Sequence, residues 1–262
     1  MAKTLTGLSL SQEQAYQERE TEKLARRMER SFTREILKAM REFAEYDGNP
    51  GKQSQAMAEH KDRLAKLLER DYSRAFDLFG ARVLRAGEKA HPGRWETKNA
   101  QDEFDRMRQA WIAQMVAQKV TPIAGTTEKQ AKRIINDIVA QATIDGLSQA
   151  ATGDRIRKAI NEQGGLLARG RSRVIARTET HSSANAAGQE AAQATGLDMQ
   201  KEWVSARGPR TREDHSEADG QTVDLAASFF VGGEELRYPG DPNGSAGNII
   251  NCRCASVHVV LD

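Results

Sequence analysis

Hydrophobic residues recur every three or four positions from Leu24 to Val83, and polar or charged residues fill the positions between them. This spacing puts the apolar side chains on one face of a helix, so it predicts two long amphipathic helices. Turn-forming residues at 47–51 separate them, which predicts an antiparallel helical hairpin. The two apolar stripes are Leu24, Met28, Phe32, Ile36, Met40 and Phe43, and Leu64, Leu68, Tyr72, Phe76, Phe79 and Val83.

Helical spacing continues beyond this hairpin in shorter segments. A third helix carries apolar residues from Phe104 to Met115 and is interrupted by Pro122. The sequence from Thr127 to Gln130 has the pattern of a capping box, so we expect a new helix to begin there. Thr152 is the expected cap of a short fifth helix, which ends at Gly164-Gly165.

The last predicted helix runs from about Arg169 to Thr195, and its second half, Ala184 to Ala194, is rich in alanine. Side chains this small let another element approach closely. Beyond Leu197 the apolar period becomes alternating, which predicts short strands. The predicted strands are 202–205, 228–231, 235–238 and 255–261, with Gly232-Gly233 joining the middle pair as a hairpin.

These patterns predict an α+β protein: a long, mainly helical N-terminal part followed by a small C-terminal module of short antiparallel strands packed on a helix. We expect residues 1–125 to form an elongated helical arm. Residues 126–262 would form a second domain, helical to about residue 196 and completed by an α+β module at 197–262.

Composition and charge narrow the classes of function. The 262 residues are 38% hydrophobic, 5% aromatic and 29% charged, a balance typical of long exposed helices. The net charge of +2 is close to neutral and does not indicate wholesale nucleic-acid binding. Residues 1–14 lack the pattern of a secretion signal, and no apolar run approaches the roughly 20 residues of a membrane span. We therefore expect a soluble protein made in the cytoplasm, with no membrane partner.

The stretch from Trp203 to Cys254 has the most specific sequence. Its landmarks, which follow the helical segment Ala176-Arg177-Thr178-Glu179, are Trp203, the run 210–215, Asp219-Gly220, Phe229-Phe230, Gly232-Gly233, the run 239–242 and Asn251-Cys252-Arg253-Cys254. This order of motifs resembles the phage Mu F-like minor head protein family, also called phage head morphogenesis proteins. The resemblance covers roughly Thr127 to His258.

The resemblance implies that residues 126–262 are a Mu F-like head morphogenesis domain and that the protein is a minor virion component. Such a protein would be in the host cytoplasm during assembly and then inside the capsid near the portal. Its implied partners are the portal and a capsid or scaffold protein, with non-specific contact to double-stranded DNA and, in some relatives, a link to DNA packaging or ejection. On this interpretation the apolar stripes of the N-terminal arm bind portal or scaffold.

Three interpretations of the C-terminal cluster compete, and the first is a metal site. His215, Cys252 and Cys254 would bind an ion such as zinc, with a fourth ligand from His181, Glu179, an aspartate or water. Cys252 and Cys254 are two positions apart, where a mutual disulfide would be strained, so reduced thiols or metal ligands are expected. Some branches of the family carry Cys-x-x-Cys where this chain has 212–215, so only half of that ligand set is kept.

The second interpretation, which we favour, is a structural cluster that binds no metal. Its members are Arg177, Glu179, Trp203, Arg212, Asp214, His215, Asp241, Asn251, Cys252, Arg253 and Cys254. Here Trp203 is the apolar anchor, and the thiols fill a tight core against the alanine-rich helix. Arg177 and Arg253 would pair with Glu179 or Asp214, while His215 caps or hydrogen-bonds a loop.

The third interpretation is a metal-dependent nuclease or toxin-like effector. It would use Asp214-His215, Asn251 and His258 around a divalent ion, or the cluster of His215, Asn251 and the two cysteines. The last histidine lies on a predicted strand, however, and no complete catalytic constellation is present. We therefore expect that the protein is not an enzyme.

Basic residues offer one local candidate for DNA contact. Arg169, Arg171 and Arg173 lie at the start of the last predicted helix, beside glycines, with few acidic neighbours. The N-terminal basic residues alternate with acidic ones, which is typical of a solvated helix face.

Overall fold

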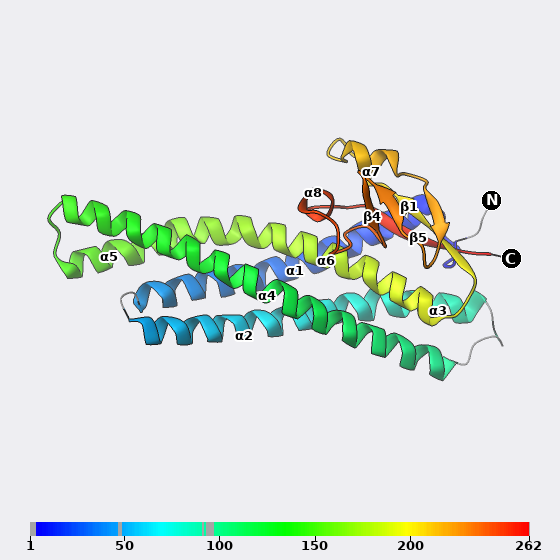
Figure 1. Cartoon of the computed structure of the whole chain (residues 1–262), viewed down its shortest axis with the longest axis horizontal. Coiled ribbons are helices and arrows are strands. Elements are labelled where there is room, and N and C mark those ends of the chain that lie inside the picture. The colour runs from blue at the N-terminus through cyan, green and yellow to red at the C-terminus, as the bar shows by residue number, and fades with distance from the viewer. Residues whose placement is uncertain (1–3, 47–48, 91, 93–96, 262) are drawn as a thin grey trace. The chain divides into compact units, whose positions relative to one another are not determined.

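The computed structural model describes residues 4–46, 49–90, 92 and 97–261, and Figure 1 shows its elements. The helices are α1 (Leu10–Glu45), α2 (Pro50–Ala75), α3 (Ala81–Ala90), α4 (Thr97–Ile144), α5 (Gln149–Ala159), α6 (Gly165–Ala194), α7 (Glu213–Glu217) and α8 (Ala246–Ile249). Two π-helical turns are η1 (Phe76–Gly80) and η2 (Ile160–Gly164), and the strands are β1 (Met199–Val204), β2 (Thr222–Asp224), β3 (Phe229–Val231), β4 (Glu234–Leu236) and β5 (Ala255–Val260). The predicted α+β class is confirmed. None of the described helices combines the length and apolarity needed to cross a bilayer.

The chain forms two compact units, each assembled from separate stretches of sequence. Unit 1 comprises Met1–Ala25, Asp71–Ile112 and Arg177–Asp262, and unit 2 comprises Arg26–Arg70 and Ala113–Ala176. Helices α1, α2, α4 and α6 each contribute a segment to both units. The division into an arm and a second domain near residue 125 stays a prediction.

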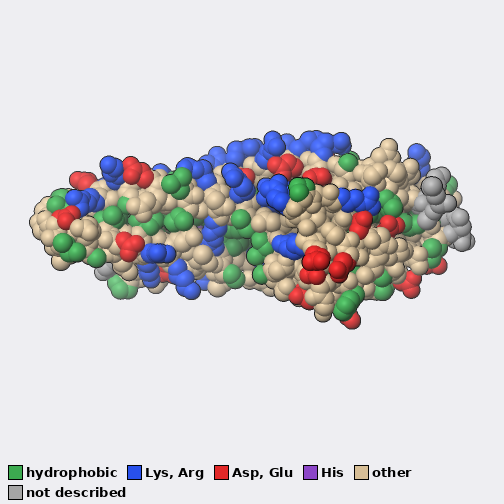
Figure 2. Space-filling model, turned by 90° about the horizontal axis from the view of Figure 1, so that it is seen from above, with side chains coloured by type: hydrophobic (Ala, Val, Ile, Leu, Met, Phe, Trp, Pro, Cys, Tyr) green, Lys and Arg blue, Asp and Glu red, His purple; other side chains and the backbone are tan. Residues whose placement is uncertain are grey.

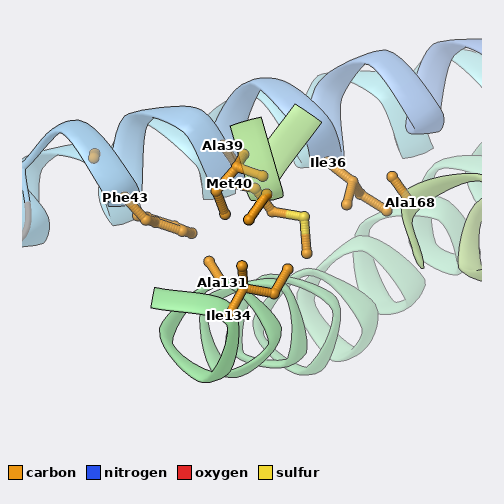
Figure 3. Packing of buried hydrophobic residues seen from close by; sticks show 10 residues of the cluster. Ile36, Ala39, Met40, Phe43, Ala131, Ile134 and Ala168 are labelled. Atoms are coloured by element: carbon orange, nitrogen blue, oxygen red, sulfur yellow. The ribbon is translucent and has the colours of Figure 1, made fainter. Parts of the chain in front are cut away.

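The core of unit 2 is built from the apolar stripe of α1 and the helices that pack on it. Figure 3 shows Ile36, Met40 and Phe43 of α1 facing Ile134 of α4, with Ala168 of α6 beside them. All of these side chains are buried. In α1 and α2 the hairpin is confirmed, since His60 bonds to Glu35 and Arg70 to Ser31 across antiparallel helices.

Burial of these stripes changes their expected role. Of the twelve stripe residues that the sequence predicts for the hairpin, only Leu24 is not buried. Such side chains are core residues because they contribute most when removed from water. They do not provide the partner-binding surface that the sequence analysis assigned to them. Asp47 and Gly48, within the predicted turn, lie outside the described residues.

Helix α4 runs unbroken through Pro122 and Thr127, so the predicted interruption and the new start are wrong. Proline inside a helix costs about 3 kcal/mol, because it removes a backbone hydrogen bond. The apolar stripe nevertheless continues across it, since Val120, Ile123 and Ala124 are all buried. Their packing outweighs the local cost. Thr127 does not cap a helix; its hydroxyl donates to the carbonyl oxygen of Ile123 at 2.9 Å.

The boundaries of α5 also differ from the prediction. Ser148, rather than Thr152, caps this helix, and its hydroxyl accepts a bond from the backbone N–H of Ala151. Gly164 does not end the helical stretch but lies in the π-helical turn that leads into α6. A Cβ at Gly164 would lie 3.2 Å from the sulfur of Met40, so this glycine serves close packing instead of termination.

The strands of unit 1 form a three-stranded antiparallel sheet in the order β2-β1-β5 and a separate β3-β4 hairpin. In the register of β1 and β5, Lys201 lies opposite His258 and Trp203 opposite Ser256. The predicted strands and the hairpin across Gly232-Gly233 are confirmed, with ends shifted by a few residues. Strand β2 was not predicted, because it is only three residues long and Val223 is its one apolar residue.

Replacing Gly80 by alanine tests the close packing in unit 1. A Cβ at this position would lie 2.2 Å from the ring of Phe104, so the ring must move and we expect a loss of about 1–3 kcal/mol in unfolding free energy. Gly170→Ala is the matched control, because that helical position is open and alanine should stabilise it by about 0.5–1 kcal/mol. Urea titration measures both. Equal unfolding free energies for the two variants would contradict this packing.

Candidate functional site

The candidate site is a buried group of one imidazole and two thiols in unit 1. His215 comes from α7, and Cys252 and Cys254 come from the loop between α8 and β5. Nδ1 of His215 lies 3.4 Å from Sγ of Cys254 and 3.6 Å from Sγ of Cys252. The three potential ligand atoms all lie within 4.8 Å of one another. This group can bind a metal ion.

Asn248 fixes the orientation of the imidazole. Its Nδ2 donates to the carbonyl oxygen of Val231, so its Oδ1 faces Nε2 of His215 at 3.3 Å. Because an amide oxygen only accepts, Nε2 carries a proton. Nδ1 therefore faces the two sulfurs. Its lone pair can bind a metal, or, with a proton on Nδ1, the imidazole can donate a hydrogen bond to sulfur. Partners of this kind behind a ligand are usual in metal sites.

Aromatic rings seal the other side of the imidazole. Trp203 is fully buried and meets His215 edge to face, with ring centroids 5.5 Å apart. Phe229 packs on the same indole at 5.4 Å. Together with Cys252 and Cys254 these rings belong to one hydrophobic cluster. The structure therefore brings together the tryptophan, the histidine and both cysteines of the predicted cluster.

The two sulfurs differ in their tendency to ionise. The Cys252 thiol, and then His215, hydrogen-bond to the sulfur of Cys254 and lower its pKa to about 5. The same contact, together with burial, raises the pKa of Cys252. The contact therefore favours ionisation of Cys254 over Cys252, and a thiolate is the form that binds a metal.

A cavity of about 320 Å³ adjoins this group. His215 and both cysteines line it, together with Arg177, Arg210, Arg212, Asn251 and Arg253. Asn251 has a left-handed backbone, with φ of 58°, and its N–H donates to the hydroxyl of Thr178. This bond holds the cysteine loop against α6.

Three acidic residues of the predicted cluster lie elsewhere. Glu179 is buried and accepts a bond from the hydroxyl of Tyr72 at 2.7 Å. Asp214 lies close to Gly232 in the hairpin turn. Asp241 is buried and accepts from the backbone N–H groups of Arg237 and Asn243, so it organises its own loop.

The expected ion pairs of Arg177 and Arg253 with Glu179 or Asp214 are not formed. In the part of the chain that the structure describes, neither arginine pairs with a carboxylate. Arg212 donates to the carbonyl oxygen of Ile250. These guanidinium groups face the cavity instead.

The arginines predicted to contact DNA have different surroundings in unit 2. Arg171 donates to Thr127 and Ile123, and burial lowers its pKa to about 10. Arg173 pairs with Glu29, and Arg169 is exposed. Over the face seen in Figure 2, basic and acidic side chains are interspersed. The three arginines thus differ in burial and partners, and their contact with DNA stays a prediction.

His258 does not join the cluster that a nuclease of the His-Asn-His type would need. It is buried in β5 and lines a second cavity of about 40 Å³, with Asn185 and Gly188 of α6. Of these two cavities, His215 lines the larger one and His258 the smaller one. Burial, and then the charge of Lys201, lower the pKa of His258 to about 4.

The sequence around this site is similar to a known family. Residues 137–257, a little under half of the chain, match the family described as phage Mu protein F like protein. The Mu F-like region contains the histidine, both cysteines and the four arginines of the larger cavity.

Two curated relatives are similar over about half of this chain. A minor head protein, GP7 of Bacillus phage SPP1, is 30% identical over 139 residues, which are 51% of this chain and 43% of that protein. An NAD(+)–arginine ADP-ribosyltransferase, EFV of Enterococcus faecalis, is 31% identical over 136 residues, again 51% of this chain but 26% of that protein. The chain thus spans less than half of either relative. No solved structure matches it.

Several residues that shape the Mu F-like site were not predicted from sequence. Asn248 orients His215, Arg210 adds a charge to the larger cavity, and Lys201 is fully buried in β1. Lys201 donates to the carbonyl oxygen of Arg237 at 2.7 Å. No motif marks these residues, because each acts through a partner distant in sequence.

We expect acid to destabilise the protein partly through His258. Its pKa is about 4 when folded and close to 6.5 when exposed, so only the unfolded chain takes up the proton between these values. Stability is complete above about pH 6.5 and falls toward pH 4, by an amount on the order of 3 kcal/mol. His258→Gln removes this proton, so its unfolding free energy should change less over that range. Parallel pH curves for both proteins would contradict the assignment.

Proposed function

We propose that this chain is a minor virion component that acts in phage head morphogenesis. The Mu F-like match over residues 137–257 carries this proposal, and the similarity to the SPP1 minor head protein supports it. The family match covers the region that folds around the candidate site. The N-terminal segments are parts of both compact units, so the proposal includes them together with the matched region.

We further propose that the protein acts without catalysing a reaction. Among the described residues, His258 lines a different cavity from His215 and Asn251, so the His-Asn-His set does not share one ion. His215, Asn251 and the two cysteines do line one cavity, and there we propose a structural role. The ADP-ribosyltransferase relative is matched over 26% of its length, which is too little to transfer its activity. Magnesium- or manganese-dependent DNA cleavage that is abolished by His215→Ala would contradict this proposal.

In this proposal the partner is the portal or another capsid or scaffold protein, and the mature location is the capsid interior near the portal, where the chain assists DNA packaging or ejection. With the helical stripes buried, a partner must use other side chains. Exposed apolar residues in unit 2 are candidates for such contacts: Val139, Ile144, Leu166, Leu167 and Val174. Ile144 and Leu166 are the most exposed of them, at 78% and 65%.

A double variant, Ile144→Asp with Leu166→Asp, tests this surface. Both residues are exposed, so the fold should be kept, while a buried charge in an apolar contact should weaken association at least about ten-fold. Co-purification with the portal, scaffold and major capsid proteins of the same phage measures the effect. Phe230→Asp, at a 63% exposed position of unit 1, is the control and should co-purify normally. Normal co-purification of the double variant would exclude this surface.

We also propose that the ion held by His215, Cys252 and Cys254 is zinc. Around tetrahedral zinc, nitrogen and sulfur ligands lie about 3.6 Å apart, close to the observed 3.4 and 3.6 Å. No fourth His, Cys, Asp or Glu side chain joins the group among the described residues, so the remaining ligand would come from the cavity. Bound zinc would tie α7 to the start of β5 and stabilise the fold.

Elemental analysis of the purified protein should find about one zinc ion per chain. His215→Ala and Cys254→Ser should lose the ion, and a chelator should lower the Tm of the wild-type protein. His258→Gln removes a buried histidine outside the group and should keep the ion. Zinc-free protein whose Tm does not respond to added zinc would leave the cluster purely structural.

A further inference from the structure

The larger cavity of unit 1 carries an excess of positive charge. Four of the residues that line the cavity are arginines, and Glu18 is the single acidic residue of the lining. Arg177 belongs to α6, while Arg210 and Arg212 lie in the loop before α7. Arg253 stands between the two cysteines. Separate parts of the chain thus bring guanidinium groups to one hollow.

These guanidinium groups have no carboxylate partners. In the described residues none of the four forms an ion pair, although arginines elsewhere in the chain commonly do. Arg177, Arg212 and Arg253 are half-buried. Removing part of a charge from water is costly without a counter-charge, so these groups are poised for an anion.

A metal in the neighbouring group would leave the charge excess unchanged. Zinc with two thiolates carries no net charge, so the four arginines would still face only Glu18, which is itself exposed. The cavity therefore attracts anions whether or not a metal is bound.

We propose that this cavity binds a phosphate group. A guanidinium offers a planar fork of donors that matches oxyanions, and a phosphate can take such forks from several directions at once, whereas a carboxylate has only two oxygens. The volume of about 320 Å³ lies near the lower end of small-molecule pockets and suits a group of nucleotide size. The phosphate belongs either to a free ligand or to a nucleic-acid backbone. This inference goes beyond head assembly and does not rest on it.

Calorimetric titration of the full chain with inorganic phosphate, AMP and adenosine tests the proposal. We expect phosphate and AMP to bind and adenosine not to bind. In the double variant R177Q/R253Q, the affinity for AMP should fall at least about ten-fold, because two charge-assisted contacts are lost. The control R34Q/R133Q removes the same charge from exposed arginines of unit 2 that form no ion pair among the described residues, and it should bind AMP normally.

Circular dichroism checks that R177Q/R253Q is folded. The double variant R210Q/R212Q, in the loop before α7, is a second test and should also weaken AMP binding. A short DNA duplex that displaces AMP would assign the phosphate to nucleic acid, and AMP binding that duplex leaves unaffected would assign it to a free ligand. Equal losses in R177Q/R253Q and R34Q/R133Q would overturn the proposal, since binding would then follow net charge alone. Equal affinity for adenosine and AMP would also overturn it. So would equal affinity for phosphate and for glutarate, a dicarboxylate titrated as a second control.

Discussion

The burial of helix α6 is the constraint on which unit 1 depends. Every residue from 178 to 192 is buried, so this segment must both pack closely and satisfy its polar side chains. Alanines provide the close packing, and several of the polar residues find partners. Glu179 accepts from Tyr72, Asn185 accepts from the N–H of Ser256, and Gln189 donates to the carbonyl oxygen of Leu225. A polar group left unpaired here would cost about 1–3 kcal/mol.

The geometry of the candidate site follows from this helix. The hydroxyl of Thr178 accepts from the N–H of Asn251, and Asn185 accepts from the N–H of Ser256 at the start of strand β5. Both ends of the cysteine loop are therefore attached to α6. The loop then presents its sulfurs to His215, which Trp203 and Asn248 hold from other sides. The position of the site thus depends on hydrogen bonds from the side chains of α6 to the backbone of the cysteine loop. The arginines of the site face the cavity.

Much of this fold follows from local pattern, and the exceptions have physical causes. The spacing of nearby residues predicts the apolar stripes of α1 and α2 and the β3-β4 hairpin. Pro122 and Gly164 were misinterpreted because they are tolerated for packing reasons that no local rule contains. Spacing also suggested the histidine and cysteine group. The role of Asn248, the engagement of Glu179 by Tyr72 and the convergence of the arginines depend on tertiary contacts between distant segments.

The interleaved units impose an order on synthesis. All of unit 2 lies before residue 177, so the nascent chain can assemble that unit while the remainder is still being translated. Unit 1 includes both the first helical turns and β5, and Thr4 bridges to Val259 at the edge of the sheet. Its early segments must therefore wait, with apolar surface exposed, until the last strand leaves the ribosome.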